Sequence, residues 1–132
     1  MLILTCPFCG VAAEETELAP GGEAHLRRHG PGSSDSEFET YLFARRNPRG
    51  VHLERWRHAH GCGKWFIAAR DTVTLQVFGT YAPQCSAPPE SVLAAIRAAR
   101  PGWQPPASGH DSASAVASAL ASTPAQTRDS LA

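Results

Sequence analysis

The sequence lacks an excess of charge of either sign. Its 132 residues include 12 Lys and Arg and 12 Asp and Glu, which gives a formal net charge of +0 at pH 7. Attraction of the whole chain to nucleic acid or to an anionic membrane surface therefore has no basis in composition. We expect no nucleic acid and no membrane among its partners.

Long hydrophobic runs are also missing. No apolar stretch approaches the roughly 18 residues that span a bilayer. The stretch from Met1 to Thr5 is too short for a signal peptide and has no basic region. We expect a cytoplasmic protein, in which thiols stay reduced and a Cys-x-x-Cys pair favours metal binding or redox chemistry over a disulfide.

The chain has little material for a large core. Hydrophobic residues make up 42% of it, and it contains 11 Pro and 11 Gly. A core built from such a chain is modest, so a bound metal or a partner would help to stabilise it. The length predicts one domain with a tail.

Against this background, the stretch Thr5-Cys6-Pro7-Phe8-Cys9-Gly10 is the strongest motif. The spacing of Cys6 and Cys9 lets both sulfur atoms point at one metal ion, about 2.3 Å from each. Pro7 fixes one φ angle, and Gly10 permits the left-handed turn that closes the loop. A structural zinc ion needs four ligands, so two more must come from elsewhere in the chain.

The second half of the site is predicted in the stretch His58-Ala59-His60-Gly61-Cys62-Gly63. Cys62 supplies a third thiolate, and one histidine completes a Cys3His set with Cys6 and Cys9. His58 is favoured because it lies four residues before Cys62, with Gly61 allowing the chain to fold back. His60, two residues before Cys62, is the other candidate.

Two other interpretations of these cysteines are open. They can be reduced thiols packed as small hydrophobic groups. Cys6 and Cys9 can also form a thioredoxin-like redox pair, although no βαβ pattern surrounds them. With four protein ligands there is no open position for water, so the zinc would be structural and we expect no catalytic residues. Cys85, among prolines, is expected to be a free thiol.

The pattern of the remaining residues predicts an α+β fold. It is a small zinc-stapled domain with short antiparallel strands, similar to a zinc ribbon, and one or two helices. Pro20-Gly21-Gly22 is expected to interrupt the chain, and Asp35 or Ser36 to cap a helix that ends before Asn47. We expect strands at residues 2–4, 16–18, 64–70 and 73–81, an extended segment at 51–57, and helices at 35–46 and 91–100.

Residues 1–82 are predicted to form the metal-binding domain. Residues 83–132 are predicted to be a tail rich in Pro, Ala and Ser, with one short helix near 90–100 and otherwise flexible or ordered by a partner. From Gly102 onward the chain has too few large apolar groups to offset the entropy lost on ordering.

Basic and aromatic side chains gather in the middle of the sequence: Arg45, Arg46, Arg49, Arg55, Arg57 and Lys64, with Tyr41, Trp56 and Trp65. This mixture is compatible with nucleic-acid binding. Acidic residues interrupt it, however, and the chain is neutral, which favours a polar protein interface where Arg and Trp are common anchors.

Several stretches together resemble the delta subunit of heterotetrameric sarcosine oxidase. They are C-P-F-C-G at the start, G-G-E-A-H at 21–25, Y-L-F at 41–43, N-P-R-G at 47–50, E-R-W-R-H-A-H-G-C at 54–62, and W-F and R-D-T-V-T after it. The resemblance covers residues 1–81, and residues from 82 onward lie outside it.

The resemblance implies a cytoplasmic subunit in a complex with alpha, beta and gamma chains, docking mainly on the large alpha chain. It implies zinc bound by Cys6, Cys9, Cys62 and His58, with FAD, FMN and NAD on the partner subunits. Such a complex oxidises sarcosine to glycine, passes the one-carbon unit to tetrahydrofolate and forms hydrogen peroxide. Related complexes, such as N-methylglutamate dehydrogenase, share this type of delta chain.

Overall fold

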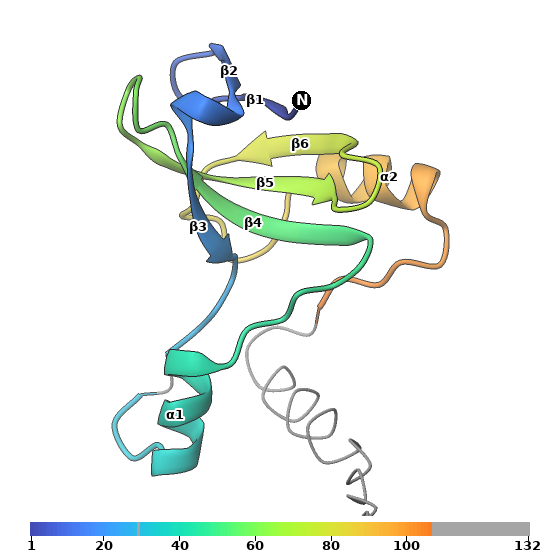
Figure 1. The fold of residues 1–132 in the computed structure, drawn as a ribbon. Helices are drawn as coiled ribbons and strands as arrows, with labels where there is room; N and C mark the ends of the chain where they lie inside the picture. The colour runs from blue at the N-terminus through green and yellow to red at the C-terminus, as the bar shows by residue number, and fades with distance from the viewer. Residues whose placement is uncertain (29, 107–132) are drawn as a thin grey trace, which may run out of the picture.

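A computed structural model describes residues 1–28 and 30–106. Two helices and antiparallel sheets make up these residues, which confirms the predicted α+β class (Figure 1). The elements are β1 (Ile3–Thr5), β2 (Ala12–Glu14), the 3-10 helix η1 (Glu15–Glu17), β3 (Ala19–Glu23), α1 (Asp35–Phe43), β4 (Val51–Arg57), β5 (Trp65–Asp71), β6 (Val77–Tyr81) and α2 (Glu90–Ala99). No helix in these ranges is long and apolar enough to cross a membrane.

The first sheet is the small antiparallel hairpin of β1 and β2, whose connecting loop holds the Cys-x-x-Cys motif. Two three-residue strands are too short to be stable alone. The hairpin is held by burial of Leu2, Leu4 and Ala13 in a core cluster with Trp56 and Phe66 of the larger sheet. The N-terminal strand, predicted at residues 2–4 and found at Ile3–Thr5, therefore delivers the motif against the main sheet.

The second sheet has four strands in the order β3-β4-β5-β6, all antiparallel. Because side chains alternate along a strand, β4 sends Trp56 to the cluster beneath the hairpin and Leu53 to the opposite face. On that opposite face α2 contributes Val92 and Ile96 to a second core cluster. The hairpin and α2 thus cover different faces of one central sheet.

The segment from residue 16 to 23 differs from the prediction. Residues 16–18 do not form a strand; the 3-10 helix η1 covers Glu15–Glu17, and the strand β3 runs through Pro20-Gly21-Gly22. Proline is tolerated there because β3 is an edge strand. A Cβ atom on Gly21 would lie 2.4 Å from the ring of Trp65, so the absence of a side chain lets the indole approach the strand.

The predicted start of the last strand is also wrong. β6 begins at Val77, and residues 72–76 form a turn although Val73, Leu75 and Val77 alternate. The Asp71 carboxylate accepts hydrogen bonds from the backbone N–H groups of Val73 and Thr74 at 2.8 and 3.1 Å. Leu75 takes a positive φ of 62°. Local side-chain hydrogen bonds therefore outcompete the alternating pattern.

The N-cap of helix α1 lies one residue before the predicted Asp35 or Ser36, and the helix ends sooner than predicted. Its N-cap is Ser34, whose hydroxyl accepts a hydrogen bond from the Glu37 N–H while the Glu37 carboxylate bonds back to Ser34. The helix ends at Phe43, three residues short of the expected boundary. None of its residues is buried, and it lies apart from the sheet in Figure 1.

Helix α2, Glu90–Ala99, lies in the stretch for which the sequence predicts a helix. Its apolar side packs on the sheet, and Trp103 packs against the same cluster beyond its end. The division of the chain at residue 82 stays a prediction, and the expectation for residues 107–132 lies outside the described residues.

Candidate metal centre

Four side chains from two distant loops converge beside the hairpin. The ligand atoms of Cys6, Cys9, His58 and Cys62 all lie within 4.8 Å of one another. The Cys6 and Cys62 sulfurs are 3.6 Å apart, and His58 Nδ1 lies 3.3 Å from the Cys9 sulfur and 3.7 Å from that of Cys62. A tetrahedral zinc ion at ordinary bond lengths requires sulfur–sulfur edges of about 3.8 Å and sulfur–nitrogen edges of about 3.6 Å. The donor set and its spacing fit such an ion.

The first loop is closed by backbone hydrogen bonds around the cysteines. The N–H of Gly10 donates to the Cys6 carbonyl at 2.9 Å, and the N–H of Cys6 donates to the Val11 carbonyl at 3.0 Å. Gly10 has a φ of 73°, in the left-handed region that favours glycine. The loop therefore holds both sulfurs on one side, as the Cys-x-x-Cys-Gly spacing predicts.

The second loop joins β4 to β5 and repeats this design. The N–H groups of Gly61 and Gly63 both donate to the His58 carbonyl, at 3.2 and 2.8 Å. Gly63, directly after Cys62, has a φ of 75°. A Cβ atom on Gly61 would come within 2.2 Å of the His58 ring, so this position must be glycine for the imidazole to reach the cluster.

The structure places the two candidate histidines differently. His58 is 2% exposed and turns Nδ1 toward the cysteines. His60 is exposed, lies outside the four-residue group, and uses its backbone N–H to bond the Glu17 carbonyl at 3.1 Å. The arrangement favours His58; zinc binding by these four residues stays a prediction.

The electrostatics of the site favour one thiolate in particular. Burial opposes ionisation of Cys6, but hydrogen bonds from the backbone N–H groups of Cys9 and Phe8, together with His58 and Cys62, outweigh it and lower the Cys6 pKa to about 6. For Cys9, the Val11 N–H acts to lower the pKa, but desolvation and the neighbouring sulfurs raise it overall. A metal cation at the centre of the group would offset the repulsion among the negatively charged sulfurs.

A buried polar network that joins β4 to β5 was not predicted from the sequence. Glu54 accepts hydrogen bonds from Trp56 Nε1 at 3.0 Å and from Arg70 Nε at 2.6 Å, and His52 Nδ1 lies 3.2 Å away. Burial raises the Glu54 pKa, but these partners outweigh it and lower the pKa to about 2. The sequence holds one indication of this network: the polar residues His52 and Glu54 occupy alternate positions of the predicted extended segment.

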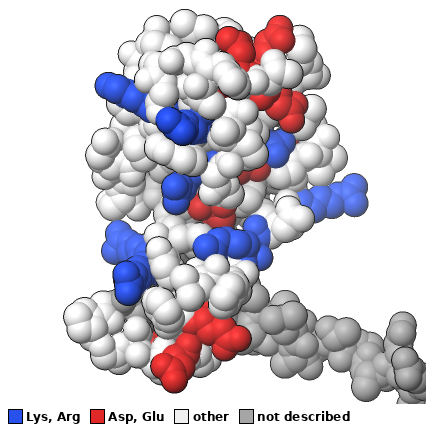
Figure 2. Space-filling view, turned by 60° about the vertical axis from the view of Figure 1, so that its left-hand side comes forward, with Lys and Arg blue, Asp and Glu red and all other residues white. Residues whose placement is uncertain are grey.

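Charge is distributed unevenly over the surface. Figure 2 shows most Lys and Arg side chains across the middle of one face, with some Asp and Glu among them, and most Asp and Glu toward its top and bottom. The acidic ends correspond to Glu14, Glu15 and Glu17 near the hairpin and to Asp35, Glu37 and Glu39 on α1. A neutral chain therefore presents a basic middle zone.

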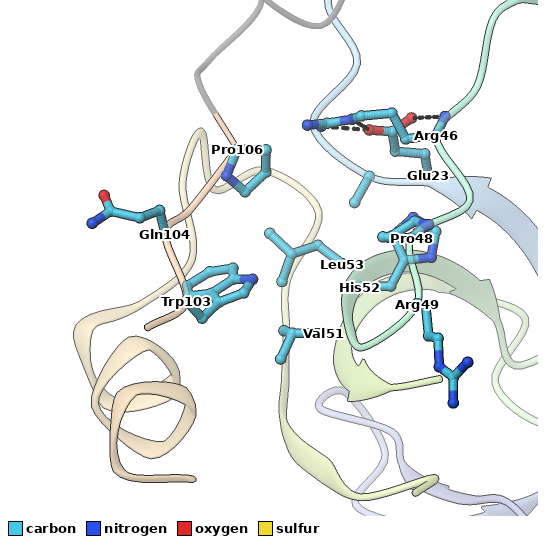
Figure 3. A pocket seen from close by; sticks show the side chains of 11 residues that line it. Glu23, Arg46, Pro48, Arg49, Val51, His52, Leu53, Trp103, Gln104 and Pro106 are labelled. Atoms are coloured by element: carbon cyan, nitrogen blue, oxygen red, sulfur yellow. Dashed lines mark hydrogen bonds and ion pairs between the residues drawn. The ribbon is translucent and has the colours of Figure 1, made fainter. Parts of the chain in front are cut away.

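A separate cavity of about 260 Å³ lies at the far end of the sheet from the metal site. Figure 3 shows Trp103 facing Val51 and Leu53 across it, with Glu23 and Arg46 paired at its edge. The Arg46 guanidinium and backbone N–H both bond to the buried Glu23 carboxylate, at 2.6 to 3.0 Å. These two charges satisfy each other and fasten the segment after α1 to β3.

The chain is similar to known delta subunits of sarcosine oxidase. The family model described as "Sarcosine oxidase, delta subunit family" matches residues 3–83. The sarcosine oxidase subunits delta of Corynebacterium sp. (strain P-1) and Arthrobacter sp are each 45% identical over 83 residues, covering 61% of this chain and 84% of the relative. That of Rhizobium meliloti (strain 1021) is 39% identical over 75 residues, covering 57% of this chain and 79% of the relative.

Proposed function

Because the chain belongs to the sarcosine oxidase delta subunit family, we propose that it is the non-catalytic, zinc-binding subunit of a heterotetrameric sarcosine oxidase. Its partners are the alpha, beta and gamma subunits in the cytoplasm. The complex oxidises sarcosine to glycine, passes the one-carbon unit to tetrahydrofolate and forms hydrogen peroxide. FAD, FMN and NAD bind to partner subunits.

The main support for the proposal, besides membership of the family, is the Cys3His group. Two loops almost fifty residues apart in the chain form it. Cys6, Cys9 and Cys62 would bind zinc as thiolates and His58 through the neutral Nδ1 atom. All four positions of a tetrahedral ion would then be filled by protein. A bound zinc would supply a crosslink and offer no open position to a substrate.

The role of this chain's own residues is to join two parts of the fold. Cys6 and Cys9 belong to the small hairpin, and His58 and Cys62 to the connection between β4 and β5. Leu4 and Phe66, each fully buried, pack between these parts. Joining them fixes the surface that this subunit presents to its larger partners.

Sarcosine is preferred to N-methylglutamate as the substrate of the complex because the relatives reported above carry the name sarcosine oxidase. The substrate pocket lies on a partner subunit. Assay of the purified complex with both amino acids tests this choice, and preferential oxidation of N-methylglutamate would contradict it.

The test of the proposed function is co-expression of this chain with the large subunits, followed by zinc analysis and turnover measurements. We expect one zinc per chain, and we expect Cys9→Ser to lower the yield of complex while the assembled fraction keeps normal turnover. His60→Ala is the matched control and should leave the yield unchanged. A Cys9→Ser complex that assembles normally but has lost turnover would contradict a structural role.

A further inference from the structure

One face of the central sheet is only half covered. In β4, Leu53, Arg55 and Arg57 point to the same face because side chains alternate along the strand. Leu53 lies in the cluster beneath α2 and is 5% exposed, whereas Arg55 and Arg57 are exposed. The helix therefore covers the apolar end of this face and leaves the end nearer the metal site open.

The open end forms a groove of about 540 Å³ between the sheet and residues 83–86. Its lining includes Leu26, Arg27, Arg55, Trp65 and Gln84. Arg55 and Ile67 are directly opposite each other in the sheet, as are Arg57 and Trp65. A surface that combines arginine, tryptophan and an aliphatic side chain has the composition of a protein-binding site.

The Trp65 ring is held in place before any partner arrives. The Arg55 guanidinium lies 5.0 Å from the ring centroid, within the range of a cation–π contact. On β3, Gly21 leaves room for the ring, since a Cβ atom there would lie 2.4 Å from it. The indole is nevertheless 39% exposed. A fixed, exposed aromatic ring loses little conformational entropy on binding.

The charge of the groove is unbalanced. No Asp or Glu lines it, and neither Arg27 nor Arg55 lies within ion-pair distance of a carboxylate in residues 1–28 and 30–106. The buried carboxylates of the sheet are already paired elsewhere, Glu54 with Arg70 and Asp71 with Arg100. His25, which also lines the groove, has a pKa lowered by burial and by Arg27, so it adds no charge at neutral pH.

We propose that this groove docks an acidic segment of the large subunit of the oxidase, with carboxylates on Arg27 and Arg55 and an apolar side chain on Trp65. The inference rests on the proposed function, which supplies the partner. The groove supplies the chemistry, since two unpaired guanidinium groups beside an aromatic ring complement a short acidic stretch with an apolar residue.

A protein segment suits this surface better than nucleic acid does. Exposed carboxylates on the hairpin and on α1, such as those of Glu14 and Glu39, would repel a phosphate backbone that extended over the surface beyond the groove. The net charge of the chain is +0, so no long-range field favours a polyanion. A short acidic peptide would stay within the groove.

The test uses the wild-type chain and the double variant Arg27→Glu/Arg55→Glu, each mixed with the separately purified large subunit. We expect the double variant to bind about a hundredfold more weakly, since like charges would then face each other. The matched control is Arg49→Glu/Arg97→Glu, which makes the same charge change at exposed sites outside the groove and should bind as wild type. Wild-type affinity should also fall as salt is raised, and less steeply in the double variant.

Zinc content and thermal unfolding of each free chain show whether the variants fold, and the milder Arg27→Ala/Arg55→Ala variant should bind with intermediate affinity. Wild-type affinity in a correctly folded Arg27→Glu/Arg55→Glu variant would overturn the groove assignment and leave the proposed function intact. A wild-type chain that binds no large subunit at all would overturn both. Loss of binding to mixed-sequence DNA, with subunit binding unchanged, would assign the groove to nucleic acid instead.

Discussion

The metal end of the molecule, formed by the β1–β2 hairpin and the loop between β4 and β5, obtains its structure in a different way from helix α1. Helix α1 has every local signal, with a Ser34–Glu37 capping box and acidic residues in its first turn, yet none of its residues is buried. The metal end consists of a hairpin of two three-residue strands and two loops, yet Leu4, Cys6 and His58 are almost fully buried. Local signals therefore decide where an element forms, whereas burial depends on contacts between distant residues.

The largest effect is expected from loss of a metal ligand. Cys6→Ser or His58→Ala should abolish zinc binding and unfold the metal end, because structural zinc stabilises small domains by about 10 kcal/mol or more. Zinc analysis and thermal unfolding measure this effect, and chelation of the wild-type protein should reproduce it.

His60→Ala is the matched control for His58→Ala, since both remove an imidazole from the same loop. It should keep its zinc because the His60 ring lies outside the group of four ligands. Zinc retained by His58→Ala and lost by His60→Ala would reverse the ligand assignment.

The next largest effect is expected at the ion pair between Glu54 and Arg70. Glu54→Gln leaves the half-buried Arg70 without its charged partner and should destabilise the fold by about 3 kcal/mol. Urea unfolding at neutral pH measures the loss. Glu90→Gln removes a carboxylate from the exposed pair with Arg97 and should cost about 0.5 kcal/mol at most.

The same carboxylate predicts a pH dependence. The folded-state pKa of Glu54 is about 2, below the ordinary value of 4.5, so the unfolded state binds more protons between these values. The stabilisation by Glu54 is therefore fully present above about pH 4.5 and is lost as the pH falls toward 2. The difference in stability between wild type and Glu54→Gln should shrink over that interval; a difference that is constant with pH would contradict this account.

A smaller effect is expected from Gly61→Ala. The added methyl group would overlap the His58 ring, so the imidazole must shift and zinc affinity should fall by about tenfold to a hundredfold. Competition with a chromogenic chelator measures the affinity. Gly30→Ala is the control, because a Cβ atom there meets nothing within 4 Å; equal losses in both variants would show that glycine flexibility, and not this contact, is responsible.

The smallest effect is expected in α1. Ser34→Ala removes the capping hydroxyl and should weaken the helix by about 1 kcal/mol. Because α1 buries no residue against the rest of the described chain, amide hydrogen exchange should accelerate in α1 and stay unchanged in β4 and β5. Equal acceleration in the sheet would show that α1 is coupled to the core.

Prediction from the sequence succeeded for segments whose structure follows from one pattern, and it failed where a single side chain or the sheet topology decides the structure. The extended segment at 51–57, predicted from alternation, and the predicted strand at 64–70 are neighbouring strands of the main sheet. The prediction failed where a single side chain reorganises the backbone, as Asp71 does for the turn before β6. It failed again at β3, where Pro20 is acceptable only because the strand lies at an edge, a fact of topology.

By itself, the sequence determined the α+β class and the Cys-x-x-Cys loop, because ligand spacing and glycine turns act within a few residues. It also indicated that this loop pairs with the region of His58 and Cys62, because a structural zinc ion needs four ligands. Tertiary structure alone decided that His58 faces the three sulfurs, that Glu54 is neutralised by Arg70, and that Arg27 and Arg55 line one groove. Each of these depends on strand register, which brings together residues that are far apart in the chain.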